Sequence, residues 1–221
     1  AFLWIVLGTF IGARVGHCLF YEPEVYLAEP WRIITGIRDG GMASHGATIG
    51  IILGVWGFTR RNHLPFIWGL DRIAIVAPLS GAIIRLGNLF NSEIVGLPTD
   101  AAWGFKFPLC AEDRVIEALA DVPARHPAQL YEAISYALFG LLGWYLYKRM
   151  PRKVGTGFFF GYCLTTIFTF RFFVEFFKEV QSDFEVGMPL DMGQLLSIPF
   201  VVLGVWCMLH SRKAQVAAGK K

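Results

Sequence analysis

The sequence has few charged residues and no long run of one charge sign. Charged side chains make up 17% of its 221 residues, and the formal net charge is +3, so a nucleic-acid-binding surface is not expected. Only four cysteines are present, and they form neither a disulfide framework nor a metal-binding pattern. A glycine-rich phosphate loop and a Gly-x-Ser-x-Gly elbow are also missing, which argues against nucleotide-loop enzymes and serine hydrolases.

What the chain has instead is apolar sequence. Hydrophobic residues account for 55% of the chain and the mean hydropathy is +0.50, values outside the range of ordinary soluble domains. Each of the six apolar runs has roughly the 17 to 25 residues that a helix needs to cross a bilayer. The runs are Ala1–Phe20, Met42–Thr59, Ile73–Phe90, Ala128–Tyr147, Val154–Phe177 and Leu190–Leu209.

These runs predict an all-α, polytopic membrane protein with six transmembrane helices. We expect residues 1–221 to form a single integral-membrane domain. Within it, the polar loop 97–127 is expected to form a small cap on one side of the membrane. The first two runs carry glycines at four-residue spacing, which indicates close helix packing. These glycines are Gly8, Gly12, Gly16, Gly46, Gly50 and Gly54.

Basic residues concentrate in alternate predicted loops. The richer set comprises Arg60, Arg61, Arg72, Lys148, Arg149, Arg152, Lys153, Arg212, Lys213, Lys220 and Lys221. The other, longer loops hold Arg32, Arg38, Lys106, Arg114, Arg125 and Lys178. The positive-inside rule places the richer set and the C-terminus in the cytoplasm, and therefore places loop 97–127 in the periplasm.

Arg85 lies near the outer end of the third run, where a charge is costly and usually functional. At helical spacing Arg85, Asn88 and Ser92 share one face. A guanidinium beside amide groups can bind a phosphate or a carboxylate. The alternative is a structural ion pair between Arg85 and either Glu93 or a carboxylate on another helix.

With the predicted topology, five of the six runs bring polar residues to the outer leaflet. Besides the Arg85 region these are His45, the segment 125–132, the pair Arg171 and Glu175, and the pair Asp191 and Gln194. Arg171 and Glu175 have the spacing of an ordinary helical salt bridge. His126 has the position of a cap or a loop contact, and Asp71 that of a helix cap and interface anchor.

A single polar cavity open to the outer leaflet accounts for all these residues together. Arg85 and Arg171, from different helices, could hold one phosphodiester while apolar walls hold acyl chains. His45 lies in a glycine-rich segment, and imidazole exchanges a proton near neutral pH. It is therefore the candidate that accepts a proton from an incoming nucleophile.

Five ordered blocks resemble the bacterial phosphatidylglycerol:prolipoprotein diacylglyceryl transferases. The signature block is similar to residues 85–96, and it departs from the family pattern at Ile84 and Leu89. The glycine and histidine block is similar to residues 39–46, with Ala47 in place of a second glycine. Residues 125–132, 170–177 and 192–199 resemble the remaining blocks, so the likeness covers essentially the whole chain.

The resemblance implies transfer of a diacylglyceryl group from phosphatidylglycerol to the lipobox cysteine in the signal peptide of a preprolipoprotein. The expected products are a thioether and glycerol phosphate, and the expected place is the periplasmic face of the inner membrane. It implies no metal and no soluble cofactor, and it implies a further span before Ala1. The nucleophile belongs to the substrate, so none of the chain's own cysteines is required.

The resemblance also suggests roles for individual residues. The catalytic candidates are His45, Arg85 and Arg171. The candidates for substrate binding are Arg85, Asn88, Asn91, Glu93, Gly96, His126 and Glu175. Two alternatives remain at this stage, another lipid-modifying membrane transferase and a membrane transporter, although transporters usually place their charges near the midplane.

Overall fold

The computed structural model describes residues 1–39, 41–110, 121–179 and 190–218, and the side chains of residues 38–39, 44–45 and 212–218 lie outside the description. The described chain is mostly helical. It divides into two compact units, Ala1–Leu70 and Asp71–Lys221, which are described here one at a time.

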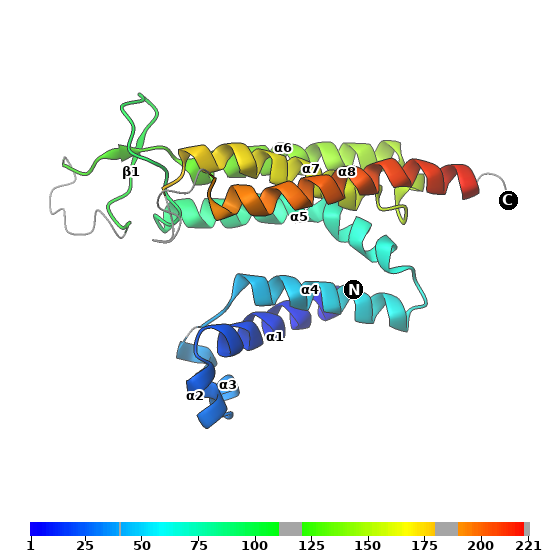
Figure 1. The fold of residues 1–221 in the computed structure, drawn as a ribbon, viewed down its shortest axis with the longest axis horizontal. Helices are drawn as coiled ribbons and strands as arrows, with labels where there is room; N and C mark the ends of the chain where they lie inside the picture. The colour runs from blue at the N-terminus through cyan, green and yellow to red at the C-terminus, as the bar shows by residue number, and fades with distance from the viewer. Residues whose placement is uncertain (40, 111–120, 180–189, 219–221) are drawn as a thin grey trace. The chain divides into compact units, whose positions relative to one another are not determined.

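The first unit is built on two antiparallel helices. Its elements are α1 (Phe2–Phe20), α2 (Pro23–Ala28), α3 (Arg32–Thr35), a 3₁₀ turn (Gly36–Asp39) and α4 (Ser44–Arg61). Helices α1 and α4 lie side by side (Figure 1). A Cβ atom on Gly12 would stand 2.8 Å from the Cα of Gly50, and one on Gly16 would stand 2.7 Å from the Cα of Gly46. The predicted role of the glycines in close helix packing is therefore confirmed.

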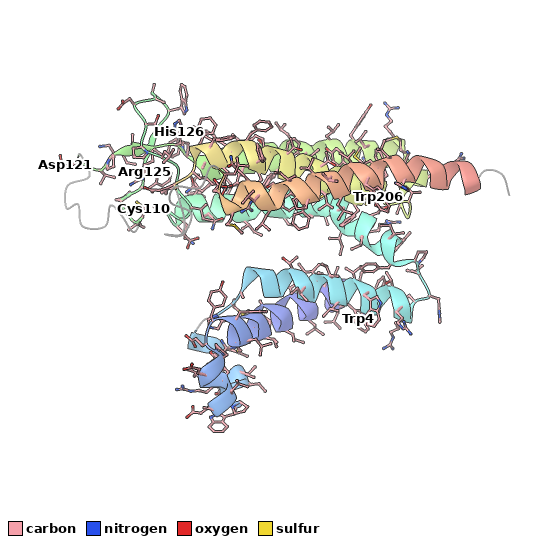
Figure 2. All side chains as sticks on the ribbon, viewed as in Figure 1. Trp4, Cys110, Asp121, Arg125, His126 and Trp206 are labelled. Carbon is pink, nitrogen blue, oxygen red and sulfur yellow. The ribbon has the colours of Figure 1, made fainter. Side chains whose placement is uncertain are left out.

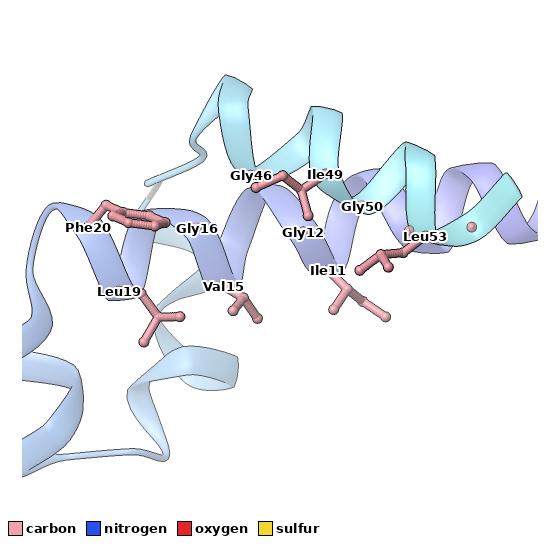
Figure 3. Close-up of a pocket in the computed structure, with 12 residues that line it drawn as sticks. Ile11, Gly12, Val15, Gly16, Leu19, Phe20, Gly46, Ile49, Gly50 and Leu53 are labelled. Carbon is pink, nitrogen blue, oxygen red and sulfur yellow. The ribbon is translucent and has the colours of Figure 1, made fainter. Parts of the chain in front are cut away.

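An apolar groove of about 440 Å³ follows the α1–α4 seam (Figure 3). Glycines from both helices form part of its lining, and Ile11, Val15 and Leu53 flank them. At one end of the seam, the guanidinium of Arg14 is buried and donates to the carbonyl oxygens of Arg32 and Ile33, both at 2.9 Å. Arg14 thus ties α1 to α3.

The second unit is an antiparallel bundle in which consecutive helices pack against each other (Figure 1). Its helices are α5 (Phe66–Phe90), which begins in the first unit, α6 (Ala128–Arg149), α7 (Phe158–Val174) and α8 (Met192–Ala218). Short 3₁₀ turns cover Pro151–Lys153 and Glu175–Phe177. Ala74, Phe159 and Cys163 form a buried core between α5 and α7.

Asp71 joins α5 to the start of α7. Its carboxylate is completely buried and accepts hydrogen bonds from the backbone N–H groups of Gly155 (2.8 Å), Gly157 (2.9 Å) and Phe160 (2.8 Å). The prediction that Asp71 caps its own helix is wrong, because α5 begins at Phe66 and the carboxylate caps α7 instead. We call this end of the bundle the Asp71 end.

The opposite end, the Arg85 end, carries two very short strands. β1 (Phe105–Lys106) pairs antiparallel with β2 (Ala124–Arg125), and isolated bridges join Gly96 to Lys178 and Pro98 to Arg125. Cys110, Arg125 and His126 lie at this end, whereas Trp206 lies toward the other (Figure 2). The predicted cap 97–127 is described except for residues 111–120.

Among the described residues, four helices are long and apolar enough to cross a membrane: α1, α5, Phe158–Phe177 and the Met192–Ser211 part of α8. α4 and α6 are also long helices, with 18 and 22 residues, but the count of six spans remains a prediction. The fifth predicted run was placed too early. Residues 154–157 form a turn because Gly155 and Gly157 adopt φ angles of 90° and 82°, which a helix cannot accommodate.

Candidate functional site

Arg85 lies in the last turns of α5, at the Arg85 end of the bundle. Its Nε atom is 2.9 Å from Oε2 of Glu132 on α6, and its Nη1 donates to Oδ1 of Asn88 at 3.2 Å. The Arg85 side chain is 15% exposed and that of Glu132 is 0% exposed. The sequence-based alternative of an ion pair with another helix is thus realised, while the Arg85 side chain as a whole keeps some exposure.

A tight turn follows α5 and brings three of the predicted residues together. Asn88 donates to the Glu93 carboxylate at 2.8 Å, and Asn91 donates to its other oxygen at 3.5 Å. The helix ends at Phe90, and Ser92 has a φ angle of 57°. The prediction that Ser92 shares a helical face with Arg85 and Asn88 is therefore wrong for Ser92, whereas the Arg85–Asn88 contact is present.

Gln129 fixes this turn to the start of α6. The amide of its buried side chain donates to the carbonyl oxygen of Glu93 at 2.6 Å. The turn is thereby held from the neighbouring helix, and the amides and carboxylate of residues 88–93 form a polar surface beside Arg85.

Glu132 is the centre of a buried charged cluster. Its Oε1 atom accepts from the Tyr136 hydroxyl at 3.0 Å and lies 3.3 Å from Nζ of Lys178. Lys178 in turn contacts the carboxylate of Glu175 at 3.1 Å, and its side chain is only 2% exposed. The negative charges of Glu132 and Glu175 are therefore balanced by the positive charges of Arg85 and Lys178, as is needed for buried charges.

Arg171, on α7, is half-buried and forms no ion pair with any residue that the structure describes. The expected salt bridge between Arg171 and Glu175 is not formed, because Glu175 pairs with Lys178. The two predicted arginines come from different helices of the second unit, Arg85 from α5 and Arg171 from α7. Their joint binding of one phosphate remains a prediction.

Gly96 lies where three chain segments meet. Its N–H donates to the carbonyl oxygen of His126 at 3.0 Å, and the next residue, Leu97, donates to the carbonyl oxygen of Phe177 at 2.9 Å. A Cβ atom on Gly96 would stand 2.5 Å and 2.6 Å from those two oxygens. Glycine is required here by close backbone packing.

His126 lines an aromatic cavity of about 380 Å³ at the same end. Its Nδ1 lies 3.1 Å from the Tyr131 hydroxyl, which also accepts from the indole N–H of Trp103 at 3.0 Å. Phe170, Phe173, Val174 and Phe177 also line the cavity. His126 therefore makes a contact from a loop, as predicted, and its ring also lines the cavity.

His45 is the second residue of α4, in the first unit, and its side chain lies outside the description. Its convergence with the arginines of the second unit remains a prediction.

Sequence patterns alone did not predict Gln129, Glu132 or Lys178 as site residues. A usable signal existed for Glu132, since an ionisable residue within an apolar run marks a functional site by default. For Lys178 the signal was its position three residues after Glu175, on the same helical face. Chemically, the assembled residues offer guanidinium donors, amides and a compensated carboxylate, which together suit an organic anion that also carries hydroxyl groups.

Comparison with known proteins gives a consistent result. The family profile described as Prolipoprotein diacylglyceryl transferase matches residues 1–210. A curated protein named phosphatidylglycerol–prolipoprotein diacylglyceryl transferase from Bacteroides fragilis is 47% identical over 223 residues, covering 96% of this chain and 77% of the relative. Proteins of the same name from Chloroherpeton thalassium (46% identity, 96% and 75% covered) and Ruegeria pomeroyi (38% identity, 95% and 75% covered) are also similar.

Proposed function

The chain belongs to the prolipoprotein diacylglyceryl transferase family, and we propose that its acceptor is the lipobox cysteine of a preprolipoprotein and its donor is phosphatidylglycerol. As a member of this family it is a transferase of lipoprotein modification. In the proposed step, the cysteine sulfur forms a bond to a glycerol carbon of the lipid. The bond from that carbon to the phosphate oxygen breaks, and its electron pair leaves with glycerol phosphate.

Arg85 and Arg171 bind the phosphate in this proposal. The observation that carries it is the state of Arg85, which is held by Glu132 and Asn88 yet makes only one hydrogen bond with the described residues. A guanidinium has five N–H donors and binds phosphate in a bidentate way. Arg171 adds a second positive charge without a carboxylate partner in the described chain. Both charges stabilise the negative charge that develops on the leaving phosphate.

The turn after α5 binds the lipid headgroup. Asn88, Asn91 and Glu93 supply amide donors and carboxylate acceptors for headgroup hydroxyls, and Glu93 is held in place by both amides. Gly96 permits the close backbone packing that positions this turn. We assign His126 to substrate binding as part of the wall of the aromatic cavity. We assign Glu175 to the substrate-binding site around Arg85, where it acts through its ion pair with Lys178.

His45 is the proposed base. A thiol has a pKa near ~8.5 and reacts as the thiolate, so a base or a positive field must assist it. If His45→Gln retained a near-normal rate with the same pH dependence, the imidazole could not be the base.

We further propose a single integral-membrane domain with six spans in the bacterial inner membrane, with loop 97–127 as a periplasmic cap. The four candidate spans, together with the lengths of α4 and α6, support this arrangement. Because α5 to α8 are antiparallel and consecutive, the Arg85 end of every helix in the bundle lies on one side of the membrane.

The direct test is an assay of the purified protein in lipid nanodiscs with phosphatidylglycerol and a lipobox peptide. Thioether-linked diacylglyceryl peptide and an equal amount of glycerol phosphate are expected. An ester-linked or amide-linked product would show another lipid transferase, and the absence of any product would contradict the proposed function.

A further inference from the structure

The buried cluster behind Arg85 contains two residues, Glu132 and Lys178, that do not bind substrate in the proposed chemistry. Glu132 is 0% exposed and Lys178 is 2% exposed, so neither can contact a lipid headgroup directly. The two oxygens of Glu132 are used differently. Oε1 receives Tyr136 and Lys178, whereas Oε2 faces Nε of Arg85 at 2.9 Å.

The contact between Arg85 and Glu132 is an ion pair without hydrogen-bond alignment. Oε2 of Glu132 has no hydrogen-bond partner among the described residues, although Nε of Arg85 is close to it. Electrostatic attraction therefore holds the guanidinium against Glu132, and the N–H groups that do not bind Asn88 are left for other acceptors. A fully aligned, bidentate pair would use two of the same donors that a phosphate needs.

Lys178 reduces the competition of Glu132 for the N–H donors of Arg85, because it neutralises the Glu132 carboxylate. Glu132 and Glu175 together carry two negative charges, and Lys178 contacts both carboxylates. With Lys178 present, Glu132, Glu175, Lys178 and Arg85 form a neutral group, and the positive charge of Arg171 remains in excess. Without Lys178, the two carboxylates would cancel the charges of both arginines, and Glu132 would compete with the lipid phosphate for Arg85.

We propose that Glu132 and Lys178 are positioning residues for the transfer reaction: Glu132 holds Arg85 in place, and Lys178 neutralises Glu132 so that Arg85 stays available to the phosphate of the lipid. This inference rests on the proposed function. It predicts that the two residues are coupled, because Lys178 acts on Arg85 through the Glu132 carboxylate, whereas its contact with Glu175 does not involve Arg85.

The experiment is a double-mutant cycle in nanodiscs, with kcat and the separate KM values for phosphatidylglycerol and for the lipobox peptide. In the wild-type background, Lys178→Met should raise the lipid KM and lower kcat/KM by about tenfold or more, with the peptide KM unchanged. In the Glu132→Gln background, the same substitution should change kcat/KM by less than about threefold. Lys178→Arg keeps the charge and should recover most of the activity.

Glu179→Gln is the matched control. Glu179 pairs with Arg125 at 2.8 Å at the same end of the bundle, but it does not contact Arg85. This variant should keep kcat/KM within about twofold of the wild type, since the glutamine side chain keeps a hydrogen-bond acceptor for Arg125.

The results separate the possibilities. Equal losses from Lys178→Met in both backgrounds would overturn the inference. The inference would also be overturned if Lys178→Met only reduced the amount of folded protein, as measured by thermal unfolding, while the remaining folded protein kept the wild-type KM for the lipid. A wild-type protein that forms no thioether would refute the proposed function, and the inference with it, whereas an active wild type with an additive cycle refutes only the inference.

Discussion

At the scale of single residues, Gly96 and Gly87 form a natural pair for comparison. A methyl group on Gly96 would meet two backbone carbonyl oxygens, whereas one on Gly87 would meet nothing within 4 Å in the described structure. Gly96→Ala should lower the free energy of unfolding by about 1–3 kcal/mol, as overpacking usually does, and should reduce transfer. Gly87→Ala should leave stability unchanged or raise it by up to about 1 kcal/mol, since alanine favours helix. Thermal unfolding of both variants in the same detergent checks this, and equal behaviour would contradict the assigned packing.

Arg85 can be tested against another arginine of the same helix. Arg85→Ala should reduce kcat by about 100-fold or more, as the removal of a donor that stabilises a developing negative charge does. Arg72→Ala removes the same charge from the Asp71 end, where Arg72 contacts Tyr147, and should keep most of the activity. The measurement is the rate of thioether formation at equal amounts of inserted protein. An active Arg85→Ala variant would remove the phosphate-binding role.

Sequence spacing predicts some of the side-chain contacts at this scale and fails to predict others. The Arg85–Asn88 contact follows from an i, i+3 spacing inside a helix. The failure at Ser92 follows from a helix end that depends on a positive φ angle, and the pairing of Glu175 with Lys178 instead of Arg171 depends on where Glu132 lies on another helix.

At the scale of elements, Asp71 is the link between α5 and α7. Asp71→Ala would leave three backbone N–H groups without their acceptor, and should lower the free energy of unfolding by about 2–4 kcal/mol, given the usual strength of hydrogen bonds to charged groups. Asp100→Ala is the control, since Asp100 is an exposed loop residue. Unfolding curves and limited proteolysis near Gly155 would show the difference. Intact folded protein should keep its turnover, because Asp71 lies at the end of the bundle away from Arg85.

The α1–α4 pair gives a second test at this scale. The added Cβ on Gly50 would collide with the backbone carbonyl of Gly8, so Gly50→Val should separate the two helices and lower the midpoint of thermal unfolding. Ile52→Val changes an exposed side chain of α4 and should have little effect. If both variants unfold at the wild-type temperature, the glycine seam does not hold this unit together.

At the scale of the whole molecule, the proposed topology predicts which loops a reagent can reach from outside the cell. The proposed nucleophile is the cysteine of the substrate, so a variant without the chain's own four cysteines should still catalyse transfer and can serve as the background. Added to it, Ala102→Cys should react with a membrane-impermeant maleimide in spheroplasts. Arg152→Cys should react only after permeabilisation, and the opposite pattern would reverse the proposed orientation.

The sequence by itself determined the class of protein and the approximate positions of the long helices. It also predicted a site at Arg85, Asn88, Asn91 and Glu93, whose side chains contact one another in the structure. Apolar runs and glycine spacing act through local geometry and burial in lipid, so they can be read without a partner segment. Only the tertiary structure decided that Asp71 caps α7, that Glu132 holds Arg85, and that Lys178 joins Glu132 to Glu175. Apart from the contact between Lys178 and Glu175, these contacts join residues 46 to 89 positions apart in the chain. A buried charge chooses its partner from whichever helix packs beside it, and that choice depends on the packing of the bundle, which no local pattern specifies.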